Sequence, residues 1–264
     1  MNQSFYVGAL GAQNCTEKLS VISNNMANVN NHGFKPKTAA FSELVNYNLN
    51  DSEGAVTELQ AGAGMKVQRT YTSFDISGVT QTSGEYDYAI MEPNAFFMIQ
   101  DPQTNAITYT RNGEFHRGER EDGFYLMTKT GKLVLDQNQE PLLLEVTDVE
   151  KLQQEMEEGY EPEEVEEDEE DEEDEDSPKV SLYTFTNPSR LMSVGDNEYV
   201  PADAGAEPIL VEHPSLMNGV LETSGTDMAK EMTRLIECQR AFTYALKMVT
   251  TSDEIEGTIN SLRG

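Results

Sequence analysis

The chain has 264 residues, 37% of them hydrophobic, and a formal net charge of −30 at pH 7. This length can hold one large or two modest domains, and the absence of a run of about 18 apolar residues argues against a membrane span. The acidic balance disfavours nucleic acid as a partner, because phosphate binding needs a basic face.

The first predicted element is a helix over about the first thirty residues. Small or apolar residues recur there at alternating spacings of three and four, which is a heptad repeat: Phe5, Gly8, Ala12, Cys15, Leu19, Ile22, Met26 and Val29. A stripe this narrow predicts packing against another helix. Asparagines and a glycine favour a helix end between Asn28 and Asn31, after which Gly33-Phe34 turns the chain away.

The next segment, 36–64, is predicted to be a connector. Its first part, as far as Asn50, is typical of a short helix or a mixed segment, and Asp51 to Gly64 is typical of a loop.

From Met65 the apolar period changes to about two, which predicts short strands separated by turns such as Asn112-Gly113. The predicted strands are Met65–Tyr71, Tyr88–Met91, Phe96–Gln100, Ile107–Thr110, Glu114–Arg117, Phe124–Thr128, Lys132–Leu135, Leu142–Val146, Val180–Phe185, Glu198–Val200 and Ile209–Val211. Many short strands with frequent turns indicate a mostly antiparallel β domain.

An acidic insert interrupts these strands. Seventeen of the residues from Glu155 to Asp176 are Asp or Glu, so much of the negative charge is local. Like charges repel and the segment has almost nothing to bury, which predicts disorder over 149–178. A solvated linker is the preferred interpretation. The alternative is an acidic module that binds divalent cations or a basic protein, although the regular ligand spacing of an EF-hand loop is missing.

The last predicted element is a long helix. Thr226 or Asp227 can cap its start, and it extends to about Leu262. Its stripe again alternates four and three residues and then shifts by one position: Met228, Met232, Leu235, Gln239, Phe242, Leu246 and Val249, followed by Ile255, Ile259 and Leu262.

The remaining residues give no sign of catalysis. Cys15 and Cys238 lie far apart in sequence and are expected to be packing residues. His32, His116 and His213 are not at metal-ligand spacing, and neither a nucleophile elbow nor a phosphate loop occurs. The sequence therefore predicts a protein that is not an enzyme, with no catalytic, cofactor or metal site.

The expected fold class is α+β, with the two terminal helices paired as a coiled-coil-like element, a central mostly antiparallel β domain and a disordered acidic loop. The expected segments are the N-terminal helix (1–35), the connector (36–64), the first part of the β domain (65–148), the acidic insert (149–178), the second part of the β domain (179–218) and the C-terminal helix (219–264).

Four blocks of sequence, in order along the chain, resemble the bacterial flagellar rod and hook proteins. They are Asn24–Asn30 with Gly33-Phe34-Lys35, then Asp87 to Phe115 with Tyr109-Thr110-Arg111-Asn112-Gly113-Glu114-Phe115, then Thr184–Asn197, and last Gly219 to Arg263 with Gln239-Arg240-Ala241-Phe242. Three features depart from the family pattern: Met91–Ala95 replaces a glycine pair with a longer turn, Gly225 stands where the family has Asn, and the acidic insert has no counterpart.

The resemblance implies an axial structural protein of the flagellar basal body, exported through the flagellar export apparatus. That route fits an N-terminus, Met1–Ser4, that does not look like a cleaved signal peptide. Copies would stack with other rod and hook proteins into a helical, torque-transmitting tube whose inner layer is made by the terminal helices. Length and the N-terminal signature favour a distal rod protein, with a proximal rod protein second and a hook protein third.

Candidate assembly residues lie on the two helices and at the end of the first. They are Leu19, Ile22, Asn24, Asn25, Met26, Asn28, Gly33, Phe34, Met232, Leu235, Ile236, Gln239, Arg240, Phe242 and Leu246. Apolar members could pack within one chain or between chains. Arg240 could fix register through a neighbour's carboxylate or pair with Glu237 or Glu231 of its own helix.

Overall fold

The computed structural model describes residues 3–44, 47–48, 60–120, 123–145, 180–202 and 206–263. The chain forms two compact units: unit 1 is Met1–Ser73 with Ser224–Gly264, and unit 2 is Phe74–Thr223. The α+β class is confirmed, because a helix lies at each end and antiparallel strands lie between. The predicted acidic insert, 149–178, falls outside the described residues.

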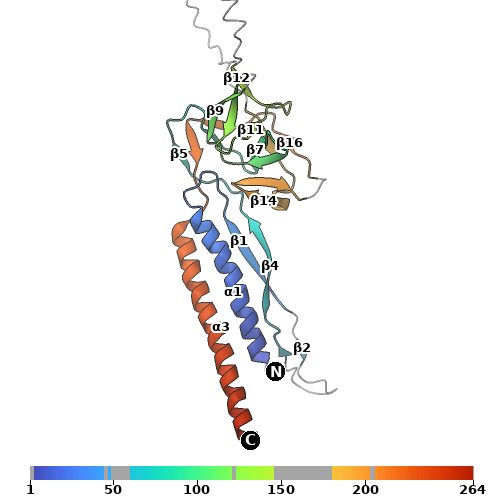
Figure 1. The fold of residues 1–264 in the computed structure, drawn as a ribbon, viewed down its shortest axis with the longest axis vertical. Coiled ribbons are helices and arrows are strands. Elements are labelled where there is room, and N and C mark those ends of the chain that lie inside the picture. The colour runs from blue at the N-terminus through green and yellow to red at the C-terminus, as the bar shows by residue number, and fades with distance from the viewer. Residues whose placement is uncertain are drawn as a thin grey trace, which may run out of the picture. The chain divides into compact units, whose positions relative to one another are not determined.

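Unit 1 contains the two long helices, α1 (Gln3–Ala27) and α3 (Met228–Arg263), which lie side by side (Figure 1). Both helices begin and end close to the predicted positions. Asp227 caps α3, since its Oδ1 accepts hydrogen bonds from the backbone N–H groups of Ala229 (3.0 Å) and Lys230 (3.2 Å). After α1, Gly33 adopts a φ of 66°, the left-handed conformation expected at this turn.

A β-hairpin completes unit 1. β1 (Lys37–Glu43) pairs antiparallel with β4 (Met65–Thr72), and β2 (Tyr47–Asn48) pairs with β3 (Gln60–Ala61). The prediction of a short helix or mixed segment is therefore wrong for Lys37–Glu43. This stretch has too few apolar residues for a clear local pattern, and its extended form is stabilised by hydrogen bonds to β4. The sequence pattern predicts that Met65–Tyr71 belongs to the central β domain, but the corresponding strand β4 belongs to unit 1.

Unit 2 is built on an antiparallel sheet to which ten of the described strands contribute, with seven of them in the order β12-β10-β11-β7-β8-β15-β14. The members are β7 (Ala95–Gln100), β8 (Ile107–Thr110), β9 (Phe115–Arg120), β10 (Gly123–Thr128), β11 (Leu133–Val134), β12 (Leu143–Glu145), β13 (Leu182–Thr184), β14 (Leu191–Gly195), β15 (Glu198–Pro201) and β16 (Ile209–Leu210). A short 3-10 helix, Pro188–Arg190, precedes β14. Sequence patterning predicted these strands except β14.

Two smaller antiparallel pairs join distant parts of unit 2. β6 (Tyr88–Ile90) pairs with β17 (Leu216–Asn218), and β5 (Val79–Gln81) pairs with β18 (Val220–Glu222). β5, β17 and β18 were not predicted, because strands of three residues give almost no periodic signal and are stabilised by their partners.

The core of unit 2 has two clusters that alternate along β7. Ala95, Phe97 and Ile99 belong to one cluster, whereas Phe96 and Met98 belong to the other. This alternation follows from the two-residue period of a strand, and it means that both faces of β7 are covered. In the second cluster, aromatic rings meet edge to face, as in the pair of Tyr109 and Phe185, whose centroids are 4.8 Å apart.

A buried ion pair connects the ends of these strands. Arg111 is 1% exposed, and its Nε donates to Oε2 of Glu222 at 2.8 Å. Its remaining nitrogens donate to the carbonyl oxygens of Ala95 (3.1 Å) and Glu92 (2.8 Å). The other Glu222 oxygen, Oε1, accepts the backbone N–H of Ser77 at 2.8 Å. These bonds hold the residue after β8, the start of β7 and the end of β18 together.

Because removing one member of a buried pair leaves the other charge uncompensated, Arg111→Met should lower the free energy of unfolding of unit 2 by about 3–5 kcal/mol. The Arg111→Met/Glu222→Gln double variant should recover part of that loss. Chemical denaturation followed by circular dichroism measures both values. Lys129→Met is the control, because it breaks the pair of the exposed Lys129 with the partly exposed Glu114 and should cost about 1 kcal/mol. Equal losses for the two single variants would contradict the argument.

Burial raises the pKa of Tyr109 in unit 2 to about 12. The neighbouring Tyr183 also raises this pKa. In the unfolded chain a tyrosine ionises near pH 10. Between these values the unfolded state has released a proton that the folded state still binds, so stability falls as the pH rises.

Tyr109→Phe should therefore weaken the alkaline loss of stability by roughly 1 kcal/mol per pH unit between about pH 10 and pH 12. Denaturant unfolding at a series of pH values measures the slope. Tyr244→Phe is the control, because this side chain is 65% exposed on α3. An unchanged slope in Tyr109→Phe would show that Tyr109 does not cause the effect.

Candidate assembly surface

The two helices of unit 1 run in opposite directions. Ser4 Oγ lies 2.9 Å from Ser252 Oγ, whereas further along α1 the carbonyl of Cys15 lies 3.2 Å from Cys238 Sγ. Between the helices is a narrow apolar cluster of Cys15, Ile22 and Cys238, with Leu19, Met26, Leu235 and Phe242 packed against it. The predicted packing role of the cysteines is confirmed, since both are buried and free.

Glycine allows the helices to approach closely near the start of α1. A Cβ atom added at Gly8 would lie 3.0 Å from Val249 Cγ2 and 3.1 Å from the Ala245 carbonyl. A Cβ at Gly11 would lie 3.6 Å from the Ala245 side chain. Gly8, a member of the predicted stripe, thus limits the separation of the helices, whereas Gly11 lies outside that stripe and a Cβ there would make an ordinary contact.

Two buried asparagines join α1 to the β1–β4 hairpin. Asn25 is 1% exposed, and its amide donates to the Lys37 carbonyl at 2.7 Å and accepts the Lys37 N–H at 2.9 Å. Asn14 does the same on β4, with bonds to the Met65 carbonyl (2.7 Å) and the Val67 N–H (2.9 Å). The amide of Asn25 is therefore used within the chain.

The other candidate residues near the end of α1 form local structure. Asn28 donates from its side chain to the Asn24 carbonyl at 2.8 Å and accepts from the Asn31 side chain at 2.7 Å. These bonds link the side chains of the last turn to one another and to the helix backbone, since the Asn24 carbonyl also accepts the Asn28 N–H at 3.2 Å. Phe34 is buried and its carbonyl accepts the N–H of Gly225 at 2.9 Å, so the turn after α1 is joined to the segment before α3.

The apolar stripe predicted for α3 separates into two faces. Leu235 and Phe242 pack against α1. Met232 and Leu246 are 50% and 44% exposed, and Gln239 is exposed. Within one chain, these five residues therefore do not share one packing face, and packing of Met232 and Leu246 between chains stays a prediction. The buried stripe instead includes Glu231, Cys238 and Ser252, polar or small residues that a search for apolar periodicity overlooks.

The exposed residues follow the helix period. Met232, Ile236, Gln239 and Leu246 lie at spacings of four, three and seven, which places them on one face. Ile236 is 49% exposed. Arg240, beside this face, is also exposed, and Glu231, one of its possible partners, pairs with Arg234 instead.

A second exposed apolar face lies on the C-terminal half of α3. Its members are spaced mostly by three, four or seven residues: Tyr244, Met248, Ile255, Ile259 and Leu262. A groove between α3 and Ser4 of α1 is lined by Tyr244, Lys247, Met248, Thr251, Ser252 and Ile255.

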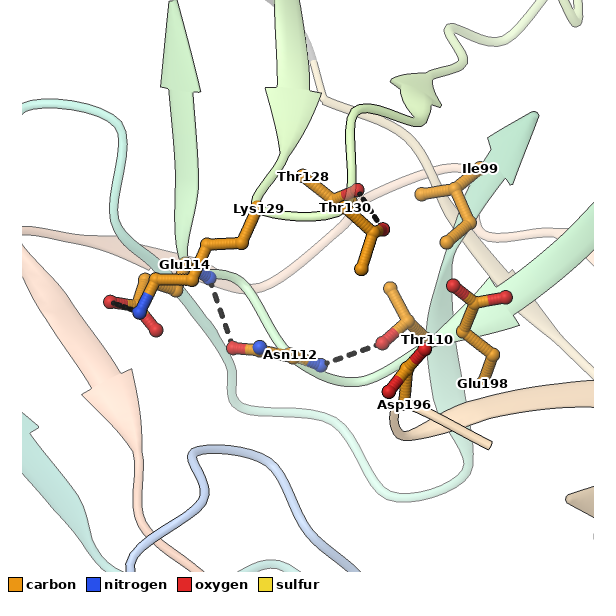
Figure 2. A pocket seen from close by; sticks show the side chains of 9 residues that line it. All are labelled: Ile99, Thr110, Asn112, Glu114, Thr128, Lys129, Thr130, Asp196 and Glu198. Carbon is orange, nitrogen blue, oxygen red and sulfur yellow. Dashed lines mark hydrogen bonds and ion pairs between the residues drawn. The ribbon is translucent and has the colours of Figure 1, made fainter. Parts of the chain in front are cut away.

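Unit 2 contains a small polar pocket, shown in Figure 2. Its volume of about 40 Å³ leaves room for a few water molecules. Its lining includes Glu114, which pairs with Lys129 at 2.6 Å, and Glu198, which accepts a hydrogen bond from Thr108 at 2.9 Å. No group of three or more His, Cys, Asp or Glu suited to a metal ion occurs in the described part of the chain. The carboxylates of Glu114 and Glu198 are thus already paired with neighbouring residues.

The sequence of this chain matches known proteins along nearly its whole length. The chain is 30% identical over 267 residues to the flagellar basal-body rod protein FlgG of Bacillus subtilis, with 97% of both chains covered. The chain belongs to the flagellar basal-body rod proteins. The family model described as flagellar basal body rod FlgEFG protein C-terminal matches residues 217–262, which include most of α3.

Two further relatives support this membership of the rod protein family. The chain is 28% identical over 275 residues to FlgG of Buchnera aphidicola subsp. Schizaphis graminum, with 99% of this chain and 100% of the relative covered. It is 29% identical over 269 residues to FlgF of Mesorhizobium japonicum, with 99% of each covered. The protein is thus a structural rod component of the flagellar basal body, as the sequence resemblance implied. Neither helix of the described chain carries a stretch apolar enough to cross a membrane.

Sequence reasoning missed several residues that organise this rod protein. Asn14 looked like an ordinary polar residue behind the α1 stripe, and only its burial identifies its role. Arg111 and Glu222 both lie in blocks that resemble the family, but their pairing requires the fold. The contact between Cys15 and Cys238 joins positions 223 residues apart.

Asn25→Ala should destabilise unit 1 by about 1–3 kcal/mol, because it leaves the N–H and carbonyl of Lys37 without partners. Hydrogen exchange of the Lys37 amide, together with thermal unfolding, measures the effect. Asn24→Ala is the matched control, since that side chain is exposed on the same helix turn. Similar protection of the Lys37 amide in both variants would contradict the role given to Asn25.

Proposed function

We propose that this rod protein self-assembles through the exposed faces of α3 into the helical rod that transmits torque from the motor to the hook. The observation that carries the proposal is the exposed face of Met232, Ile236 and Leu246, each 44–50% exposed. A helix already packed on one side has no use for a second apolar face in a monomer. Contiguous exposed apolar surface is typical of protein interfaces.

The proposed contacts use different parts of α3 for different neighbours. Within the chain, Leu19, Ile22, Met26, Leu235 and Phe242 join α1 to α3 as a coiled-coil-like pair, supported by their common apolar cluster. Between chains, the Met232 face and the Tyr244 face would each receive a helix of another copy or of a different rod or hook protein. Arg240 would pair with a carboxylate of such a neighbour.

We further infer that unit 1 forms the inner layer of the rod and unit 2 the outer layer. Unit 1 contains the two helices with apolar faces, whereas unit 2 has a closed core of its own. The predicted segments fit this division if β1 and β4 are counted with the helices. Asn24, Asn28 and Gly33 would then shape the turn from α1 into β1 within the inner layer.

The proposal also covers the expectations about enzymatic activity, export and position in the flagellum. The protein is structural and not an enzyme, which is supported by relatives that are rod proteins. It passes through the flagellar export apparatus before assembly. A rod position is preferred to a hook position, because FlgG and FlgF rod proteins match the chain over nearly their full length; the distal rod remains our preferred location.

The Met232→Asp/Ile236→Asp double variant should fold normally but be absent from isolated basal bodies. Each side chain would bury apolar surface worth about 1–2 kcal/mol at an interface, and a carboxylate there would add a cost of desolvation. The measurement is the amount of protein in basal bodies purified from a strain that lacks the wild-type copy, together with swimming motility.

Met192→Asp is the matched control, because this methionine is 61% exposed but lies on β14 of unit 2. It should incorporate normally. Thermal unfolding of the purified variants checks that each one folds. Normal incorporation of the double variant would overturn the proposed role of this face.

A further inference from the structure

We propose that Cys15 and Cys238 can form a reversible intrachain disulfide bond that ties α1 to α3. The two residues are the only cysteines in the sequence. Cys238 Sγ lies 3.2 Å from the carbonyl oxygen of Cys15, and both side chains belong to one buried cluster. Such a bond is independent of the proposed assembly faces.

The two side chains meet between the helices, because Cys15 acts on the Cys238 thiol through a side-chain hydrogen bond and the Cys238 sulfur reaches the Cys15 backbone. A disulfide needs Cα atoms about 4.4–6.8 Å apart, so the two helices must lie close together at the bond. Gly8, about two turns before Cys15, lies in tight contact with α3, since a Cβ added there would be 3.0 Å from Val249 Cγ2. The neighbouring side chains of the cluster, such as Leu19 and Leu235, are apolar and would remain packed around a disulfide.

The chemistry is thiol–disulfide exchange with a low-molecular-weight disulfide such as oxidised glutathione. One cysteine thiolate attacks this oxidant, forms a mixed disulfide and releases one glutathione thiolate. The second cysteine then attacks the mixed disulfide and releases the other. Two protein thiols are oxidised, one glutathione disulfide is reduced to two thiols, and the two protons go to the leaving thiolates or to solvent.

Burial determines how the bond would form and what it would do. Cys15 and Cys238 are 5% and 3% exposed, and burial raises the pKa of the Cys238 thiol. Exchange therefore proceeds through local opening of the helices or during folding. Once formed, the bond would close a loop between positions 223 residues apart, which restricts the unfolded chain strongly.

The test uses the full-length purified protein. Reduced protein is incubated with oxidised glutathione, both as the native protein and while it refolds from denaturant. Free thiols are then alkylated in denaturant, and the intact mass and a peptide map are recorded. We expect a monomer that has lost two hydrogen atoms, takes up no alkyl group and yields a peptide linking Cys15 to Cys238. Its melting temperature should exceed that of the reduced protein by roughly 5–10 °C, reversibly on adding dithiothreitol.

Several results would overturn the proposal. These are thiols that remain fully alkylatable after refolding with oxidant, a product that is only a glutathione adduct, a disulfide that links two chains, or an intrachain bond that lowers the melting temperature. Cys15→Ser and Cys238→Ser are controls for the peptide assignment: each has one thiol, which is either alkylated or carries one glutathione, and neither should yield the linked peptide. The comparison of reduced with oxidised wild-type protein needs neither variant.

Discussion

Unit 1 depends on how closely α1 can approach α3. Gly8 leaves little space for a Cβ atom, which would lie 3.0 Å from Val249 Cγ2 and 3.1 Å from the Ala245 carbonyl, so the two helices are close at this point. The contact is made by a narrow stripe, and the centre of that stripe contains only a few large apolar side chains. Packing of this kind depends on shape and not on the amount of buried apolar surface, which explains why small residues occupy so many of its positions.

Buried polar side chains also fix how the elements of each unit pack, in addition to the apolar contacts. In unit 1, Asn14 and Asn25 satisfy backbone groups of the hairpin that would otherwise lack partners. In unit 2, Arg111 and Glu222 do the same for backbone groups of two separate segments, Glu92–Ala95 and Ser77. Because a buried polar group is costly unless every bond is made, these residues specify one arrangement of the chain. They therefore define the geometry of each unit more sharply than the apolar residues do.

The faces of α3 connect this architecture with the role of a rod protein. One face is used within the chain, and its polar members, Glu231 and Ser252, are buried there. Two further faces carry exposed apolar residues. A helix with three such faces is suited to a crowded assembly in which each copy has several neighbours, and this is the basis of the proposed division into inner and outer layers.

The sequence by itself determined the α+β class, the extent of both helices and most strands of the main sheet. It also determined membership of the rod family, because four separate blocks resembled that family. Local periodicity carries this information, and periodicity is strong in long helices and in alternating strands. Most of the α1 stripe was correct for the same reason, since Gly8, Ala12, Cys15 and Ile22 are all buried, whereas Phe5 is 40% exposed.

Only the tertiary structure decided which stripe of α3 faces α1, where β1 and the three-residue strands lie, and which polar residues are buried. Leu235 and Leu246 are indistinguishable by hydrophobicity, yet one is packed in the cluster and the other is 44% exposed. The physical reason is that the partner surface selects the buried face, and α1 offers glycines where α3 offers Ala245 and Val249. Long-range pairs such as Arg111 with Glu222 leave no local pattern, because their energy depends on a distance that exists only in the folded chain.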